Sequence, residues 1–246
     1  MKIKEYLIFT SKKNIDLKIC VVSDLHSLPS ADCLSAIEGV RSDMIICAGD
    51  MLERVDGSRD EKNQSGIEFL SKLSKIAPTY YTFGNHERLG SHREMRKKPV
   101  GGEYISKSNL EKIKNTGVTL LNNEFISLDN LSICGIMPCS EPKDIELLEE
   151  FSRLGGYKLL VVHQPEYYDK YKNFDFDIMI SGHTHGGQWR FFGRGAYAPD
   201  QGVFPKYSAG IYDDRLIVSA GAANPQSPIP RIFNPKEILL IHIKSQ

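Results

Sequence analysis

Metal-competent side chains follow apolar runs at several places along this 246-residue chain. His183 and His185 stand one residue apart at the end of one such run. Asp24 and His26 repeat that spacing after the apolar run 17–22. Residues i and i+2 share one face of an extended backbone, so each pair is expected to aim both side chains at one place. This spacing favours a metal site built at the ends of strands.

Three further apolar runs end in the same way, with a carboxylate, an amide or an imidazole. The full set of expected metal ligands is Asp24, His26, Asp50, Asn85, His163, His183 and His185. Two carboxylates, one amide and four imidazoles are too many for one tetrahedral zinc and suit two divalent ions of Mn, Fe or Zn. Because the set lacks a thiolate, a structural zinc site is disfavoured. Asp50 follows the middle strand of the first three and is the expected bridge between the ions.

Each of these residues also has an ordinary structural explanation when it is considered alone. Asp24 could cap the turn after its strand, and Asp50 could be a turn or helix N-cap residue. In an open α/β sheet, however, sites form in the crevice beyond the carboxyl ends of the strands. Two neighbouring ions can hold a hydroxide between them and clamp phosphoryl oxygens, which favours in-line attack on phosphorus.

Predicted strands and helices must bring these positions together. Two opening strands, 3–10 and 16–23, are expected to form a hairpin across the polar turn 11–14. Further strands are expected at 44–48, 79–83, 118–121, 124–128, 131–136, 158–162, 176–180, 207–211, 216–218 and 237–243. Helices are expected at 31–40, 67–76, 106–114 and 143–153. Turns at 122–123, 129–130 and 213–214 are expected to make hairpins, and the aromatic stretch 189–207 a long ordered loop.

Composition limits the class of protein. Lys plus Arg and Asp plus Glu both number 31, and this zero net charge weighs against a general binder of nucleic acid or anionic membrane. The five cysteines form no Cys-x-x-Cys pair and are expected to be buried in a reducing compartment. No run approaches the ~18 apolar residues that a membrane-spanning helix needs. We therefore expect a soluble, cytoplasmic protein with one α/β domain over residues 1–246.

The ordered motifs resemble those of the calcineurin-like metallophosphoesterase superfamily. They are Asp24-x-His26, Gly49-Asp50, Gly84-Asn85-His86-Glu87, His163 and Gly182-His183-x-His185. The stretch 182–188, in the form Gly-His-Thr-His-Gly-Gly-Gln, and the tail 231–237 are similar to its bacterial branch. That branch includes phosphodiesterases and pyrophosphatases acting on lipid-linked substrates. The resemblance implies a four-layer α/β/β/α sandwich of two mixed β-sheets flanked by helices.

The resemblance also implies how the ligands divide between two ions. One ion would be held by Asp24, His26, Asp50 and His185, and the other by Asp50, Asn85, His163 and His183. His86 would lie beside the ions, where it could stabilise phosphoryl charge or protonate the leaving oxygen.

Substrate contacts are expected from three further side chains. Arg54 faintly resembles an arginine that contacts phosphate in related protein phosphatases. Arg88 opens the basic segment 88–98, which is either a solvated loop or a phosphate-facing lid. Gln188 begins the loop that would meet the substrate. The sequence departs from the family pattern at Ala220, where an arginine is expected, and in showing no membrane-anchoring helix before its first strands.

The leading interpretation is a dinuclear metal-dependent phosphohydrolase. It would cleave a phosphodiester, pyrophosphate or phosphomonoester by in-line attack of a metal-bridging hydroxide. The expected partner is a small-molecule or lipid-linked phosphoester, with peripheral membrane contact left open. A nuclease of the same superfamily is an alternative that the zero net charge weakens. A catalytically silent scaffold is a third interpretation, disfavoured because His86 and every ligand are retained.

Overall fold

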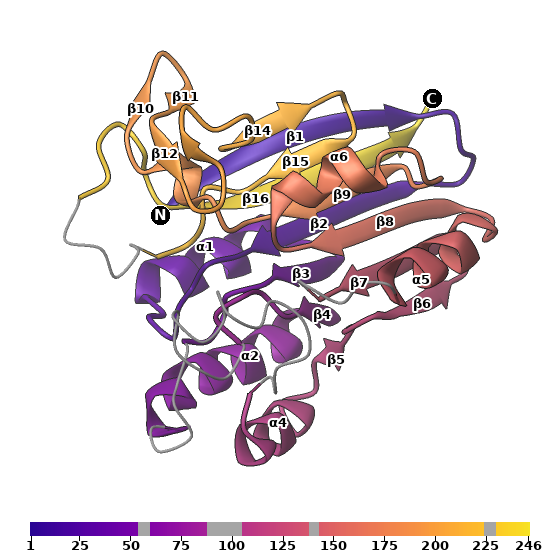
Figure 1. Ribbon diagram of the computed structural model, residues 1–246. Coiled ribbons are helices and arrows are strands. Elements are labelled where there is room, and N and C mark those ends of the chain that lie inside the picture. The colour runs from indigo at the N-terminus through magenta and orange to yellow at the C-terminus, as the bar shows by residue number, and fades with distance from the viewer. Residues whose placement is uncertain (54–59, 88–104, 138–142, 224–229) are drawn as a thin grey trace.

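Two mixed six-stranded sheets pack face to face, with helices on both outer faces (Figure 1). The computed structural model describes residues 1–53, 60–87, 105–137, 143–223 and 230–246. The strand order is β1-β16-β2-β3-β4-β5 in the first sheet and β14-β15-β9-β8-β7-β6 in the second. The expected four-layer α/β/β/α sandwich is therefore confirmed.

The elements of each layer come from separate parts of the chain. The first sheet contains β1 Lys2–Thr10, β16 Glu237–Ser245, β2 Asp16–Val22, β3 Met44–Ala48, β4 Thr79–Thr82 and β5 Thr119–Leu120. The second contains β14 Gly210–Tyr212, β15 Leu216–Val218, β9 Ile178–Ser181, β8 Tyr157–Val162, β7 Leu131–Ile136 and β6 Glu124–Leu128. The helices are α1 Ala31–Val40, α2 Gln64–Ile76, α4 Lys107–Lys114, α5 Lys143–Ser152 and α6 Tyr168–Tyr171. Single 3-10 turns lie at η1 Asp60–Asn63, η2 Pro165–Tyr167 and η3 His185–Gly187.

The central strands are apolar on both faces because each sheet is covered by the other sheet on one face and by helices on the other. On β2, Ile19 and Val21 pack between the two sheets, whereas Cys20 and Val22 belong to the layer under α1 and α2. The second sheet packs in the same way against α5 and α6. Strands covered on both faces are continuous apolar runs, which is the pattern that made them easy to predict.

The predicted opening hairpin is wrong, although both of its strands exist. The C-terminal strand β16 lies between β1 and β2, parallel to the first and antiparallel to the second. Seen in Figure 1, the two ends of the chain therefore run through the same sheet. A central strand buries more apolar surface than an edge strand, and β16 is buried along most of its length. The turn 11–14 is local to the sequence, but the pairing it was expected to direct depends on residues more than 200 positions away.

A second predicted hairpin is also wrong. The strand β5 pairs in parallel with β4 in the first sheet, while β6 pairs with β7 in the second. The chain thus changes sheets at Asn122 and Asn123. The hairpins β6–β7 and β14–β15 are confirmed. The stretch 189–207, predicted as a loop, contains two short ladders, β10 Arg190–Phe191 with β11 Arg194–Gly195 and β12 Tyr197–Ala198 with β13 Gly202–Val203.

Two expectations from composition concern the cysteines and the membrane. Cys20, Cys33, Cys47 and Cys134 are buried thiols without a disulfide, and Cys139 lies outside the described residues. In the part of the chain that the structure describes, no helix has both the length and the apolar character needed to cross a bilayer.

Candidate metal centre

The expected ligands gather where the carboxyl ends of five strands meet. They follow β2, β3 and β4 in the first sheet and β8 and β9 in the second. Backbone hydrogen bonds hold these strand ends together: Asp24 N donates to Gly49 O (3.0 Å) and Gly182 N to His163 O (2.9 Å). One bond crosses between the sheets, since His183 N donates to Asp24 Oδ1 (2.9 Å). The sandwich therefore converges on one edge, as the sequence pattern predicts.

The backbone at these positions is not extended, which corrects the expectation that each pair shares one face of a strand. The strands end at Val22 and Ser181, before the ligand pairs begin. Five of the expected ligands have φ in the left-handed region, namely Asp24 (54°), His26 (52°), Asp50 (50°), His183 (69°) and His185 (46°). This conformation costs non-glycine residues free energy and tends to persist where a site requires it. The pair His183 and His185 is split between two places, whereas Asp24 and His26 still meet at one.

Six of the expected ligands form two groups. The first group contains Asp24, His26 and His185, and the second contains Asp50, His163 and His183. In each group the ligand atoms lie within 4.8 Å of one another, close to the ~4 Å span of atoms bound to one ion at ~2.1 Å. His163 Nε2 links the groups, because it lies 3.0 Å from Asp50 Oδ2 and 3.9 Å from Asp24 Oδ1.

The first group is tightly packed. His26 Nε2 lies 3.3 Å from His185 Nε2, and His185 Nε2 lies 3.7 Å from Asp24 Oδ1. Asp24 is fully buried, and its Oδ2 atom has no hydrogen-bond partner among the described residues. Burying a carboxylate oxygen without a partner is costly unless a cation or proton compensates it. A divalent ion fits this donor set.

Opposing charges shift the acid–base equilibria of both groups. Burial alone would lower the pKa of His163, but the Asp50 and Asp24 carboxylates raise it to about 10. Burial alone would raise the pKa of Asp50, but His163 and His86 hold it well below its usual range. Burial, with His26 and Arg231 nearby, lowers the pKa of His185 to about 3. A proton on His163 can thus balance the carboxylates, and a bound cation would displace it.

Asn85 and His86 lie on the loop after β4, beside Asp50. His86 N donates to Asp50 Oδ1 (2.7 Å), and the Oδ1 atom of Asn85 is buried. Gly84 approaches Asp50 so closely that a Cβ there would lie 2.2 Å from Asp50 Oδ1. Gly49 is similarly close to the His163 ring, where a Cβ would meet Nδ1 at 2.4 Å. Glycine is therefore required at both positions for the loops to meet.

Glu53 is a site residue that the sequence interpretation missed. Its two carboxylate oxygens contact two histidines: Oε1 lies 2.7 Å from His86 Nδ1 and Oε2 lies 3.4 Å from His26 Nδ1. The rings of His26 and His86 meet edge to face at 4.5 Å. Burial would raise the pKa of Glu53, but these histidines hold it below its usual range. Glu53 opens a charged loop, and nothing in its spacing distinguishes it from its neighbours.

Glu87 shapes the loop that carries Asp50. Its buried carboxylate accepts hydrogen bonds from the backbone N–H of Asp50 (3.0 Å), Leu52 (2.9 Å) and Gly84 (2.7 Å). The Tyr81 hydroxyl donates a fourth (2.6 Å). Burial, and then the nearby Asp50 carboxylate, raise the pKa of Glu87. The residue belongs to the motif after β4, and its carboxylate fixes the backbone of the loop that carries Asp50.

Arg231 comes to the first group from the tail of the chain. Its Nη2 atom lies 3.4 Å from His185 Nδ1 and donates to Ala223 O (2.6 Å). Its Nε and Nη1 atoms are buried and have no hydrogen-bond partner within the described residues. Burial lowers the pKa of Arg231 to about 10. The family pattern has an arginine at position 220, where this chain has alanine, whereas the structure brings Arg231 to His185.

Outside the second group, His183 contacts an acidic side chain that was also missed. His183 Nε2 lies 3.0 Å from Asp200 Oδ2, to which Gln164 Nε2 also donates (3.1 Å). Carboxylates of this kind commonly fix the orientation of metal-binding imidazoles. Asp200 lies in the stretch 189–207, and only the fold brings it to His183.

The expected substrate contacts are only partly described. Gln188 is half-buried at the start of the loop after η3, and its carbonyl oxygen accepts a hydrogen bond from Asn234 Nδ2 (3.2 Å). Arg54, Arg88 and the basic segment 88–98 lie outside the described residues.

Comparison with known proteins gives consistent matches. A family model described as calcineurin-like phosphoesterase matches residues 17–187. The uncharacterized metallophosphoesterase Cj0846 of Campylobacter jejuni is 28% identical over 94% of this chain and 60% of its own length. An uncharacterized metallophosphoesterase of Helicobacter pylori strain J99 is 30% identical over 98% and 64%. Phosphodiesterase YaeI of Escherichia coli is 28% identical over 76% and 67%. The chain thus spans less than two thirds of the first two relatives.

Proposed function

We propose that this chain, which belongs to the calcineurin-like phosphoesterase family, is a metal-dependent phosphoesterase that works as a dinuclear phosphohydrolase. The observation that supports this proposal is the pair of ligand groups, each with a carboxylate and two imidazoles, joined through His163. One group alone would suit a single ion. Two groups at one strand edge suit two ions that share a substrate.

We assign Asp24, His26 and His185 to one ion and His163 and His183 to the other. Asp50 is placed to serve both, with Asn85 beside it on the neighbouring loop. Two divalent ions of Mn, Fe or Zn bound here would activate water and neutralise charge on the phosphoryl group. The proposed reaction is in-line attack of water on phosphorus, without a phospho-enzyme.

His86 is the proposed general acid. Glu53 accepts a hydrogen bond from its Nδ1 atom (2.7 Å), which orients the ring. In its protonated form the imidazole can give its second proton to the departing oxygen. Glu53 also contacts His26, so it ties the general acid to the first ligand group.

Arg231 is the proposed contact for the substrate's phosphoryl oxygens. Two of its guanidinium nitrogens are buried without a partner in the described residues, next to His185. A guanidinium fork matches a phosphoryl group, and charge-assisted hydrogen bonds are strong where water is excluded. In this interpretation Arg231 supplies the positive charge that position 220 lacks.

The test is a substrate panel combined with metal analysis. Phosphomonoesters, phosphodiesters such as bis-p-nitrophenyl phosphate, nucleotide-sugar pyrophosphates and lipid phosphates would be assayed with Mn²⁺ and with a chelator. The name of the Escherichia coli relative makes a phosphodiester the first candidate. We expect chelator-sensitive hydrolysis and two bound ions per chain. Hydrolysis that survives removal of metal, or no more than one ion per chain after Mn²⁺ loading, would overturn the proposal.

A further inference from the structure

A lobe of exposed aromatic side chains lies next to the metal centre. We call residues 189–207 together with 232–233 the aromatic lobe. Phe192, Phe204 and Phe233 are 106%, 81% and 78% exposed. Other exposed apolar side chains of the lobe are Trp189, Phe191, Tyr197, Val203 and Ile232. In Figure 1 the ladders β10–β11 and β12 stand out beyond the ends of the sheets. Several exposed apolar side chains on one such lobe indicate an interaction site.

The three most exposed phenylalanines are held outward by strained backbone. Phe192, Phe204 and Phe233 have φ of 51°, 54° and 52°, in the left-handed region. Bulky residues seldom adopt this conformation, because their Cβ crowds the backbone there. Glycine or asparagine would relieve that strain. Phenylalanine at all three positions therefore needs a reason other than folding.

The lobe is an ordered platform. Trp189 Nε1 donates to Pro230 O (3.0 Å), and Arg190 Nη2 donates to Gly193 O (2.7 Å). The rings of Phe191 and Phe233 contact each other edge to face at 6.2 Å. The side chains meant to contact a partner are thus already arranged, which reduces the entropy lost on binding.

The charge of the lobe is positive. Residues 189–207 contain Arg190, Arg194 and Lys206 but a single acidic residue, Asp200. Asp200 contacts His183 and Gln164, on the side of the metal centre. Lys206 pairs with Asp169 (2.7 Å), so the arginines supply the uncompensated charge. Lys4 on β1 lies close enough to Arg190 that the two cations repel each other.

We propose that the aromatic lobe docks the protein on an anionic phospholipid bilayer. Exposed aromatic rings insert at the boundary between headgroups and acyl chains, while arginines contact anionic headgroups. Phenylalanines exposed at three separate places, together with arginines, fit the apolar and anionic layers of a bilayer surface. Since η3 runs directly from His185 into the lobe, docking would hold the metal centre at the membrane surface. If the proposed function also holds, the substrate is a phosphoester carried by a membrane lipid.

The test uses the single tryptophan of the chain, which lies on the lobe at position 189. The protein would be titrated with vesicles of phosphatidylcholine alone or with 40% phosphatidylglycerol, about the anionic content that gives a strong surface potential. We expect sedimentation with the anionic vesicles, a blue shift of the Trp189 emission, and weaker binding at high salt. The triple variant Phe192→Ser, Phe204→Ser, Phe233→Ser should need at least tenfold more lipid for half-saturation.

The matched control is the double variant Leu7→Ser, Phe9→Ser, which removes two other exposed apolar side chains (58% and 57%) from β1. It should bind anionic vesicles as the unmodified protein does. Both variants should keep the rate on a soluble phosphodiester, so failure of docking and failure of the proposed function are separable. No vesicle binding, or equal binding by the triple variant, overturns the inference. Loss of self-association in the triple variant without vesicle binding would instead assign the lobe to a second copy of the chain.

Discussion

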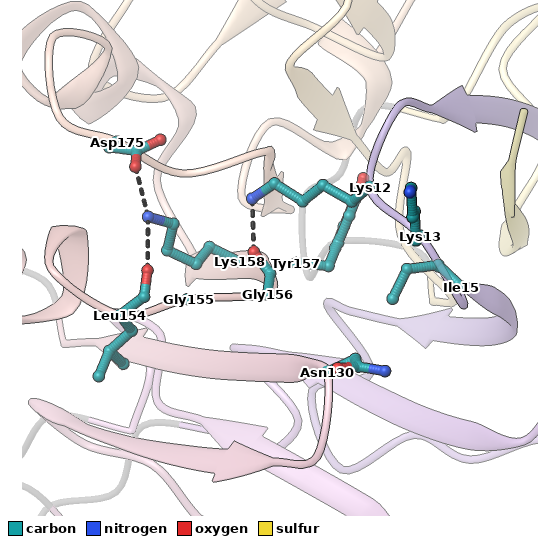
Figure 2. A pocket seen from close by; sticks show the side chains of 10 residues that line it. All are labelled: Lys12, Lys13, Ile15, Asn130, Leu154, Gly155, Gly156, Tyr157, Lys158 and Asp175. Atoms are coloured by element: carbon teal, nitrogen blue, oxygen red, sulfur yellow. Dashed lines mark hydrogen bonds and ion pairs between the residues drawn. The ribbon is translucent and has the colours of Figure 1, made fainter.

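The two ends of the same strands carry opposite kinds of polar surface. At the carboxyl end of β8 lies His163, in the metal centre, and at its start lies Lys158. By a rise of ~3.3 Å per residue the two are only about 17 Å apart. Lys158 lines a hollow of about 410 Å³ that we call the basal pocket (Figure 2). Its lining residues are Lys12, Lys13, Ile15, Asn130, Leu154, Gly155, Gly156, Tyr157, Lys158 and Asp175.

Lys12, Lys158 and Asp175 of the basal pocket are paired within the protein. Lys158 Nζ donates to the carbonyls of Ser152 (2.9 Å) and Leu154 (3.0 Å) and to the Asp175 carboxylate. Lys12 Nζ donates to Gly156 O and Asp177 Oδ2 (2.5 and 2.6 Å). Figure 2 shows Lys158 turned toward Asp175 and the Leu154 carbonyl, and Lys12 turned toward the Gly156 carbonyl. The hollow is of the size that ligands occupy, but its charges already hold the loops together.

The metal centre differs in two respects, which together mark it as the functional end. Its buried polar atoms include Asp24 Oδ2, without a partner in the described residues, and five of its seven expected ligands lie on left-handed backbone. Both features cost stability, and both persist in the folded chain. A hollow with satisfied charges indicates structure, whereas strained and unsatisfied groups indicate chemistry. The experiments below test whether substitutions at the metal centre change activity while substitutions at the basal pocket change stability.

The largest expected effect is that of Asp50→Asn. Replacing the carboxylate that we propose serves both ions should lower kcat about 10³-fold or more, because the charge of the site changes where the substrate reacts. Phosphodiester hydrolysis and bound metal would be measured together. The matched control is Asp175→Asn, which removes a carboxylate from the basal pocket and should leave the rate within about twofold, as expected away from the site. Equal rates in the two variants would contradict the contrast between the two ends.

The next effect concerns His86. His86→Ala should lower kcat about 10²-fold, the scale of general acid catalysis, while bound metal is retained. The loss should be larger for an ester with a poor leaving group than for a nitrophenyl ester, because only the former needs protonation. Glu53→Gln should cause a smaller loss of about tenfold, since it only orients the ring. A loss independent of the leaving group would argue that His86 is not the acid.

A smaller effect is expected at Arg231. Arg231→Met should lower kcat/KM about tenfold, the value of one charge-assisted hydrogen bond of about 1.4 kcal/mol, and Arg231→Lys should recover part of it. Arg215→Met is the matched control, because its guanidinium donates to the carbonyls of Lys172, Phe174 and Phe176. That variant should lose stability and keep activity. If both variants behave alike, Arg231 is a structural residue.

Local sequence patterns predicted most of the strands and the positions where expected ligands would gather. Apolar runs covered on both faces are conspicuous, and polar residues at their ends mark the sheet edge, so Asp50 and His163 could be placed near each other. The hairpin of β1 with β2 could not be corrected locally, because the pairing with β16 spans the whole chain. Site residues such as Glu53 and Arg231 were missed for the same reason.

The left-handed backbone of the ligands was also invisible in the sequence. A glycine in the sequence indicates that left-handed backbone is possible at its position, but an aspartate or a histidine gives no such indication. The i, i+2 spacing of His183 and His185 instead predicts an extended backbone. The strand must end before the pair for the two imidazoles to reach separate groups. Spacing thus identified the residues, the family resemblance implied their division between two ions, and the folded backbone gives the physical reason for that division.

At the basal pocket the expected effect is on stability. Lys158→Met leaves two carbonyls and one carboxylate without their donor, which should cost about 2 kcal/mol, or about 4–8 °C in Tm for a chain of this size. Calorimetry would measure the change, and kcat at a temperature well below Tm should stay within about twofold of the unmodified rate. A tenfold loss of kcat in a folded Lys158→Met protein would show that the basal pocket takes part in function.

The smallest expected effect is the pH dependence of the stability difference between the unmodified and Lys158→Met proteins. The hydrogen bond from Lys158, then its charge, lower the pKa of Asp175 in the folded protein. A lowered folded pKa contributes stability that is fully present above the unfolded pKa of ~3.9 and is lost as pH falls through the folded value. Because Asp175 is largely exposed, its share should be only about 0.2–1 kcal/mol. The free energies of unfolding of the unmodified and Lys158→Met proteins, measured by denaturant titration, should therefore converge by that amount as the pH falls from neutral through the lowered folded pKa of Asp175. The remaining difference would belong to the Ser152 and Leu154 carbonyls, which do not titrate. If the difference in free energy of unfolding grew as the pH fell, Lys158 would not stabilise the ionised Asp175. The two residues would then not be a structural ion pair.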